Sequence, residues 1–265
     1  MREWVCPPSG GLTPEACDNG GMDNQPCVST VVEYPLVCED NFGTVETVCR
    51  SDGHSFVFEL RGRTFRGRAF GCLWVDDSDM ADLPPGSFPV RRYGPTSNSC
   101  DLAAKFTITL PLGIVGAKQP AGHLVLGFDY RDDDVVDGRL TIDGAVFTQT
   151  SCGWVEGNLI GLQLQLPPGM FLACCLSCRW SHFNPSGADD IGSLGCFVDW
   201  PDAATISNKP TVFRAWREAQ EHDQFQYVQE TWRCPRFRLI QPGELAYKDW
   251  DWFVHRKDGR VPPTS

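Results

Sequence analysis

The sequence predicts an α+β protein: mainly antiparallel β-sheet or sandwich, one or two short helices, and a C-terminal subdomain stapled by a four-cysteine zinc site. About six segments between residues 55 and 149 alternate apolar with polar side chains at short spacing, which is typical of antiparallel strands. Beyond residue 154 the apolar period becomes that of a helix. The second half also carries a Cys-x2-Cys pair followed by two single cysteines, a ligand pattern typical of structural zinc.

The strands come first along the chain. Residues 56–61 and 64–70 are separated by Gly62-Arg63 and form a predicted hairpin with one buried face. Residues 104–110 and 123–130 give two further strands. Residues 139–142 and 145–149 flank Asp143-Gly144, a dipeptide that strongly favours a two-residue hairpin turn.

A helix is expected over residues 154–166, because Val155, Leu159, Leu162 and Leu166 fall on one helical face and Pro167-Pro168-Gly169 ends the pattern. A strand remains the alternative, since Leu162, Leu164 and Leu166 also alternate with glutamines. The predicted elements that follow are a short strand at 169–174, a loop at 182–195, a helix at 211–220 and a strand at 225–232.

Three regions are expected. Residues 1–53 are a Cys/Gly/Pro-rich N-terminal extension with few apolar runs, and residues 54–249 are the main β-rich domain, with the zinc-knuckle subdomain at about 169–240. Residues 250–265 form a tail whose end is frayed. Its Trp250 and Trp252 either dock on the domain as a final strand or form a protein-binding patch.

The expected zinc ligands are Cys175, Cys178, Cys196 and Cys234. Cys174 lies next to the Cys-x2-Cys pair and would point the opposite way along a strand, into the core. Buried thiols without metal, a disulfide pair, and replacement of one ligand by His182 or Cys174 remain alternatives. Four thiolates leave no open coordination position, so the predicted site is structural.

Charge and cysteine content limit the function. The formal net charge is -11 and the basic residues are scattered, which argues against nucleic acid or an anionic membrane as a partner. There is no apolar stretch of about 18 residues and no apolar signal core near the N-terminus. We therefore expect a cytoplasmic protein whose 13 cysteines are reduced or bound to metal.

Motifs for nucleotide, lipase-type and zinc-protease chemistry are absent from the sequence. Cys178 and His182 lie four positions apart, a spacing that chance readily produces in a chain with this many cysteines. A non-enzymatic binding or accessory protein is expected, and its acidic surface suits a basic protein partner. The alternative is an enzyme of unrecognised class that uses the cysteine region.

Five segments resemble an uncharacterised bacterial family defined only as a domain of unknown function, over roughly residues 55–240. They are GWVE at 153–156, LIGLQLQLP at 159–167, CCLSCRWSHFNPSG from 174, GSLGCF from 192, and VQETWRCPRF from 228. The resemblance implies no activity. It implies only an association with toxin, immunity or other accessory genes of bacteria.

Overall fold

The computed structural model describes residues 31–75, 83–84, 86–92, 100–119, 121–131, 135–152, 154–185 and 190–259. The strands are β1 Val32–Asp40, β2 Gly43–Ser51, β3 Phe56–Leu60, β4 Arg63–Ala69, β5 Cys72–Val75, β6 Val90–Arg92, β7 Cys100–Leu102, β8 Lys105–Val115, β9 Ala121–Asp129, β10 Val135–Ile142, β11 Ala145–Cys152, β12 Phe171–Ala173, β13 Ser181–Phe183, β14 Leu194–Cys196 and β15 Gln226–Val228. The helical elements are α1 Val155–Gln165, α2 Lys209–Glu221, the 3-10 turns η3 Cys175–Ser177 and η4 Ala203–Thr205, and the π-helix η5 Asp251–Lys257.

A large antiparallel sheet forms the body of the molecule. Its strand order within the described residues is β11-β10-β9-β8-β1-β2-β3-β4-β5, and β12 also pairs with β8. Alternate residues of β8, from Phe106 to Ile114, are buried, whereas the residues between them are partly or fully exposed. The predicted β-rich architecture with few helices is therefore confirmed.

Aromatic side chains fill the core between the hairpins. Phe70 lies at the centre, with its ring 5.0 Å from the rings of both Phe106 and Phe128 and 4.7 Å from the ring of Phe56. All four side chains are fully buried. Because these residues come from β3, β8, β9 and the turn after β4, their contacts join distant strands into one core.

Two tight turns set the strand register. At Arg61-Gly62 and at Asp143-Gly144 both residues have positive φ, of 48° and 75° and of 49° and 84°. This is the backbone of a type I′ hairpin turn, in which glycine carries the second position without strain. The resulting β3–β4 and β10–β11 pairings confirm the two hairpins that the sequence predicts.

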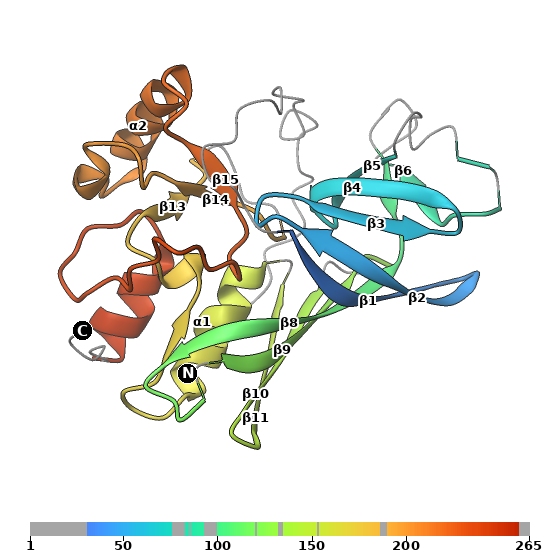
Figure 1. The fold of residues 1–265 in the computed structure, drawn as a ribbon, viewed down its shortest axis with the longest axis horizontal. Coiled ribbons are helices and arrows are strands. Elements are labelled where there is room, and N and C mark those ends of the chain that lie inside the picture. The colour runs from blue at the N-terminus through green and yellow to red at the C-terminus, as the bar shows by residue number, and fades with distance from the viewer. Residues whose placement is uncertain are drawn as a thin grey trace.

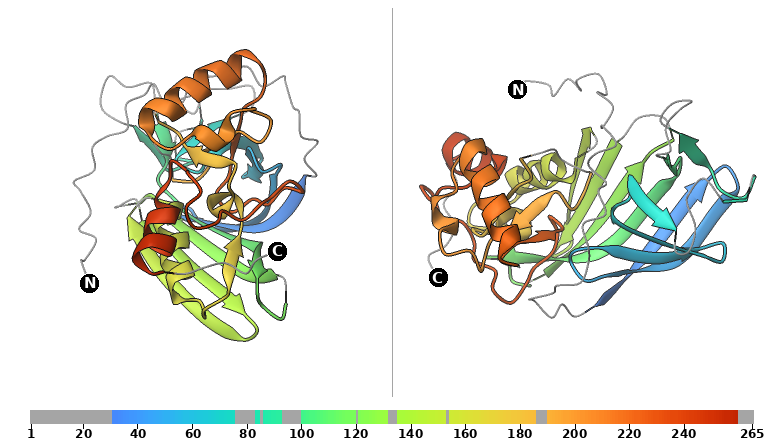
Figure 2. Two further views of the ribbon diagram at one scale, coloured as in Figure 1. Left: turned by 90° about the vertical axis from the view of Figure 1, so that its left-hand side faces the viewer. Right: turned by 90° about the horizontal axis from the view of Figure 1, so that it is seen from above.

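A smaller unit gathers at one end of the large sheet. It contains the sheet β13-β14-β15, α2 and the C-terminal helix η5, and it lies on the side where α1 packs against β10 and β11 (Figure 1; Figure 2, right). α2 begins at a capping box in which Asn208 and Thr211 exchange side-chain to backbone hydrogen bonds, with proline in the first turn. Both predicted helices, 154–166 and 211–220, are thus present.

Three parts of the chain differ from expectation. Residues 32–51, assigned to the N-terminal extension, form β1 and β2 in the middle of the large sheet, where β1 pairs with both β2 and β8. The predicted loop at 182–195 begins and ends in strands β13 and β14. The start of the tail is a helix rather than a strand or a frayed end, and Trp250 is fully buried. Residues 1–30 lie outside the described residues.

Within the described part of the chain, seven cysteines are thiols that form no disulfide: Cys38, Cys49, Cys174, Cys175, Cys178, Cys196 and Cys234. Cys72 is disulfide-bonded, so the expectation that the thiols are reduced does not extend to every cysteine. No helix in the described part of the chain combines the length and apolar character needed to cross a membrane.

Candidate metal centre

The Cys-x2-Cys segment folds as one tight turn. After β12 the chain enters η3, and the Ser177 hydroxyl donates to the carbonyl oxygens of Leu172, at 2.6 Å, and Cys174, at 3.0 Å. The Cys178 amide then donates to the Cys175 carbonyl at 3.0 Å. A single turn of this kind brings two thiols of one segment together, as a zinc knuckle requires.

The segment that carries Cys234 runs alongside this turn. The Cys175 amide donates to the Trp232 carbonyl at 2.6 Å, and the Arg179 amide donates to the Arg238 carbonyl at 2.8 Å. Backbone hydrogen bonds therefore hold both sides of the Cys175–Cys178 turn against residues 232–238. Cys234 lies between these two points.

Cys196 comes from the small sheet. It ends β14, where it pairs with Ser181 of β13 on one side and with Gln226 of β15 on the other. The Phe197 amide donates to the Trp180 carbonyl at 2.9 Å, which ties the end of β14 to the residues just after Cys178. The fold thus brings a third segment to the same place.

The four predicted ligands share one electrostatic neighbourhood. Burial raises the pKa of the Cys175 thiol well above its usual range, and the charges of Cys178, Cys196 and Cys234, followed by that of Cys174, raise it further. Burial raises the pKa of Cys196 to about 12, and Cys178 and Cys234 add to this effect. Each of these charges therefore acts on the thiols of its neighbours.

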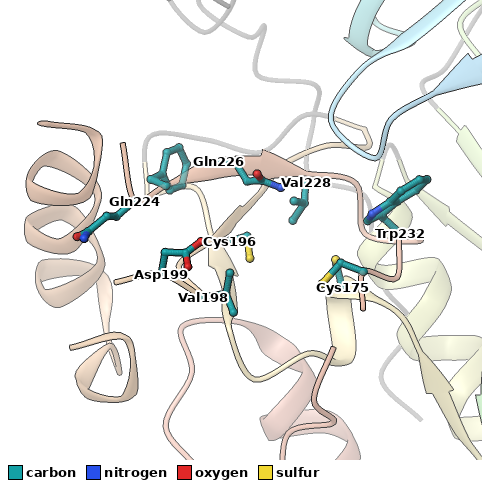
Figure 3. A pocket seen from close by; sticks show the side chains of 10 residues that line it. Cys175, Cys196, Val198, Asp199, Gln224, Gln226, Val228 and Trp232 are labelled. Carbon is teal, nitrogen blue, oxygen red and sulfur yellow. The ribbon is translucent and has the colours of Figure 1, made fainter. Parts of the chain in front are cut away.

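A small cavity lies beside three of the four predicted ligands. Its volume is about 20 Å³, and Cys175, Cys196 and Cys234 line it together with Val198, Asp199 and Trp232. Figure 3 shows Cys175 and Cys196 reaching this space from two different segments. A cavity of this size holds about one water-sized particle, whereas pockets for organic ligands span roughly 300–1,000 Å³. Among the described residues, no group of three or more His, Cys, Asp or Glu side chains is placed so that it could hold a metal ion.

A buried lysine lies behind the knuckle. The Lys248 ammonium donates to the Cys178 carbonyl and, at 3.0 Å, to the Ser181 hydroxyl. Burial lowers its pKa to about 8, and the nearby Cys178, Cys175 and Cys174 thiols and the Glu156 carboxylate oppose that shift. Among the described side chains no carboxylate forms an ion pair with Lys248. A buried cation with only neutral hydrogen-bond partners is costly unless an anion lies nearby.

His182 is fully buried, and its ring accepts a backbone hydrogen bond. Its Nδ1 accepts the Tyr247 amide at 3.1 Å, and its Nε2 has no hydrogen-bond partner among the described residues. Burial holds the pKa of His182 well below its usual range, so the ring is neutral, and the proton must sit on Nε2 because Nδ1 accepts. Neither nitrogen then offers a lone pair to a metal.

Cys174 lies in the main core, fully buried, and is the N-cap residue that precedes η3. Burial raises its pKa to about 11, whereas hydrogen bonds from Ser177 and Leu176 lower it. Of the four cysteines that raise the pKa of Cys175, Cys174 contributes least. These features suit a packed apolar side chain beside the centre.

Several buried charged residues in this part of the molecule belong to no recognised sequence motif, so the sequence analysis did not identify them. Lys248 is one, and Glu156 and Glu230 are others, exposed by only 7% and 2%. Glu230 accepts the amides of Gly192 and Ser193 at 2.7 and 2.9 Å. The sole sequence signal for the two glutamates is that they lie in the GWVE and VQET segments of the family resemblance.

Comparison with known proteins places part of this region in a defined family. The model of a family of unknown function, DUF6304, matches residues 32–181, more than half of the chain. No curated protein and no solved structure matches. The matched range begins before residue 55 and ends before residue 240, so it contains Cys175 and Cys178 but not Cys196 or Cys234. The chain belongs to the DUF6304 family of unknown function.

Proposed function

We propose that this protein is a non-enzymatic binding protein whose C-terminal unit is stabilised by a structural zinc ion on Cys175, Cys178, Cys196 and Cys234. The observation that carries the proposal is that Cys175, Cys196 and Cys234, from three segments, line one cavity of about 20 Å³. The charge of Cys178 acts on the thiols of both Cys175 and Cys196. Zinc favours a tetrahedral set of four thiolates, and such sets are closed structural sites.

Lys248 supports this assignment through its charge. Four thiolates and Zn²⁺ together carry a net charge of about -2, and the buried ammonium beside Cys178 would compensate part of it. The raised pKa of the Cys175 and Cys196 thiols means that metal binding must displace their protons. Zinc affinity should therefore increase with pH.

The size of the cavity argues against the enzyme alternative in the cysteine region. A second hollow of about 260 Å³ lies between η4 and α2, with Trp200, Asp202 and Arg214 among its lining residues. No cysteine or histidine lines that hollow, so the thiols and the larger space are separate. A substrate site would instead combine a roomy pocket with reactive groups.

Metal analysis tests the proposal directly. The full chain, purified without chelator, should contain about one zinc per chain, and Co²⁺ in its place should show thiolate-to-cobalt charge transfer and tetrahedral d–d bands. Cys234→Ala should abolish both and lower the melting temperature, because metal binding and folding are linked. Cys174→Ala is the matched control and should retain the metal. A metal-free protein without a cobalt-thiolate spectrum would refute the zinc assignment.

The partner is proposed to be a basic protein, as an immunity-type protein would bind. The support is the net charge of -11, which would steer a cationic partner. The test is the association rate with the product of the neighbouring gene at low and high ionic strength. The rate should fall steeply with added salt; a rate independent of salt would argue against a charge-steered basic partner.

A further inference from the structure

Cys234 differs from the other three proposed ligands in its exposure. Cys175, Cys178 and Cys196 are exposed by only 4%, 4% and 9%, whereas Cys234 is half-buried. Its neighbours Arg233, Pro235 and Arg236 are all exposed. A small reagent from solvent therefore reaches the centre at Cys234 first.

Two partner thiols stand beside it. Cys175 and Cys196 line the same small cavity as Cys234, and the pKa of each responds to the charge of Cys234. A sulfenic acid at Cys234 would therefore form beside a cavity that two further cysteines line. Neighbouring thiols of this kind resolve sulfenic acids into disulfides.

We propose that the cysteine centre is also a peroxide-sensitive switch, in which Cys234 is the first sulfur oxidised and Cys196 or Cys175 closes a disulfide with it. The inference rests on the proposed zinc centre. The Cys234 thiolate attacks one oxygen of hydrogen peroxide, the O–O bond breaks, and the products are a sulfenic acid and hydroxide. The second thiolate attacks the sulfenic sulfur and expels hydroxide. Two electrons pass from two thiolates to the peroxide, and two hydroxides leave as water after protonation.

Disulfide formation removes two of the four ligands, so the remaining pair releases zinc. The backbone contacts of the Cys175–Cys178 turn to residues 232–238 and the attachment of β14 to Trp180 then lose their common metal anchor. The switch would thus loosen the small sheet.

The experiment uses the zinc-loaded full chain treated with hydrogen peroxide in the presence of a sulfenic-acid trap. Trapped adduct should appear first on Cys234. Without the trap, a disulfide from Cys234 to Cys196 or Cys175 should form, and a chromophoric chelator measures the zinc that is released.

Cys234→His retains a zinc-binding nitrogen but no oxidisable sulfur, and should slow peroxide-driven zinc release by about ten-fold or more. Cys38→Ser is the control, because Cys38 is a buried thiol of β1 whose pKa is raised to about 12, and its release rate should equal that of the wild type.

The possible failures are distinguishable. A protein that never holds zinc overturns the proposed function and the switch together. A protein that holds zinc but is oxidised first at another cysteine, or whose Cys234→His variant releases zinc as fast as the wild type, overturns the switch alone.

Discussion

Asp190 is a carboxyl group whose surroundings oppose its ionisation. Its Oδ1 accepts the Ile191 amide at 2.9 Å, and its Oδ2 accepts the Gly71 amide, from the turn between β4 and β5, at 3.4 Å. Burial nevertheless raises the pKa of Asp190 to about 7, and the charge of Glu230 raises it further. The residue joins the segment before β14 to the large sheet, so its charge state bears on how these two parts are held together.

Asp190→Asn should change how stability depends on pH. A carboxyl group with a raised folded pKa stabilises the fold fully below its unfolded pKa, near 3.8, and loses that contribution as pH rises through about 7. The free energy of unfolding of the wild type should therefore fall relative to Asp190→Asn between pH 4 and 7, by at most about 1.4 kcal/mol per pH unit. Urea unfolding at several pH values measures the difference, and parallel pH profiles would contradict the assignment.

At the scale of elements, α1 docks on β10 and β11 through a polar side chain. The Asn158 amide nitrogen donates to the carbonyls of Val136, at 3.0 Å, and Gln149, at 2.7 Å. This approach is possible because residue 138 is glycine: a Cβ there would lie 1.8 Å from Asn158 Oδ1. The docking of α1 on the sheet therefore depends on the absence of a side chain at Gly138.

Gly138→Ala should destabilise the protein by about 2–3 kcal/mol, because the methyl group overlaps the Asn158 amide. In an Asn158→Ala background the same substitution should cost less than half as much, since the overlap is gone. Gly127→Ala on the adjacent β9 is the matched control. Its Cβ would meet no atom closer than 3.6 Å, so its cost should stay within about 1 kcal/mol. Additive costs in the double variant would disprove the steric explanation.

At the scale of the whole molecule, residues 247–255 connect parts that are distant in sequence. The Tyr247 carbonyl accepts the Phe183 amide of β13 at 2.8 Å, and the Asp249 amide donates to Glu156 at the start of α1 at 3.2 Å. Trp250 and Val254 are fully buried. The C-terminal segment, residues 247–255, therefore links the small sheet to α1; we call it the clasp.

Trp250→Ala should cost about 3–5 kcal/mol of folding free energy, as expected for removal of a fully buried aromatic side chain. Trp154, which is 53% exposed just before α1, provides the control, and Trp154→Ala should change stability by less than about 0.5 kcal/mol. Denaturant unfolding followed by far-UV circular dichroism measures both. Equal effects of the two substitutions would show that the clasp contributes little.

Much of the fold was predictable because it is encoded locally. The β3–β4 and β10–β11 hairpins follow from alternation around a turn dipeptide, and α1 and α2 follow from apolar period and capping residues. The ligand set proposed from cysteine spacing stays a prediction. β1 and β2 were not recognised as central strands, because a strand does not specify its partners, and the pairing of β1 with β8 spans about seventy residues.

The amino-acid sequence by itself determined the hairpins, the helices and the Cys175–Cys178 turn, because each depends on side chains within a few positions of one another. Only the tertiary structure decided that Cys196 and Cys234 flank that turn, that Lys248 lies behind it, and that Trp250 closes the C-terminal segment over α1. Burial and electrostatics act between groups that are close in space, whatever their separation along the chain. Neither the partial exposure of Cys234 nor the raised pKa of Asp190 can therefore be recognised from local sequence patterns.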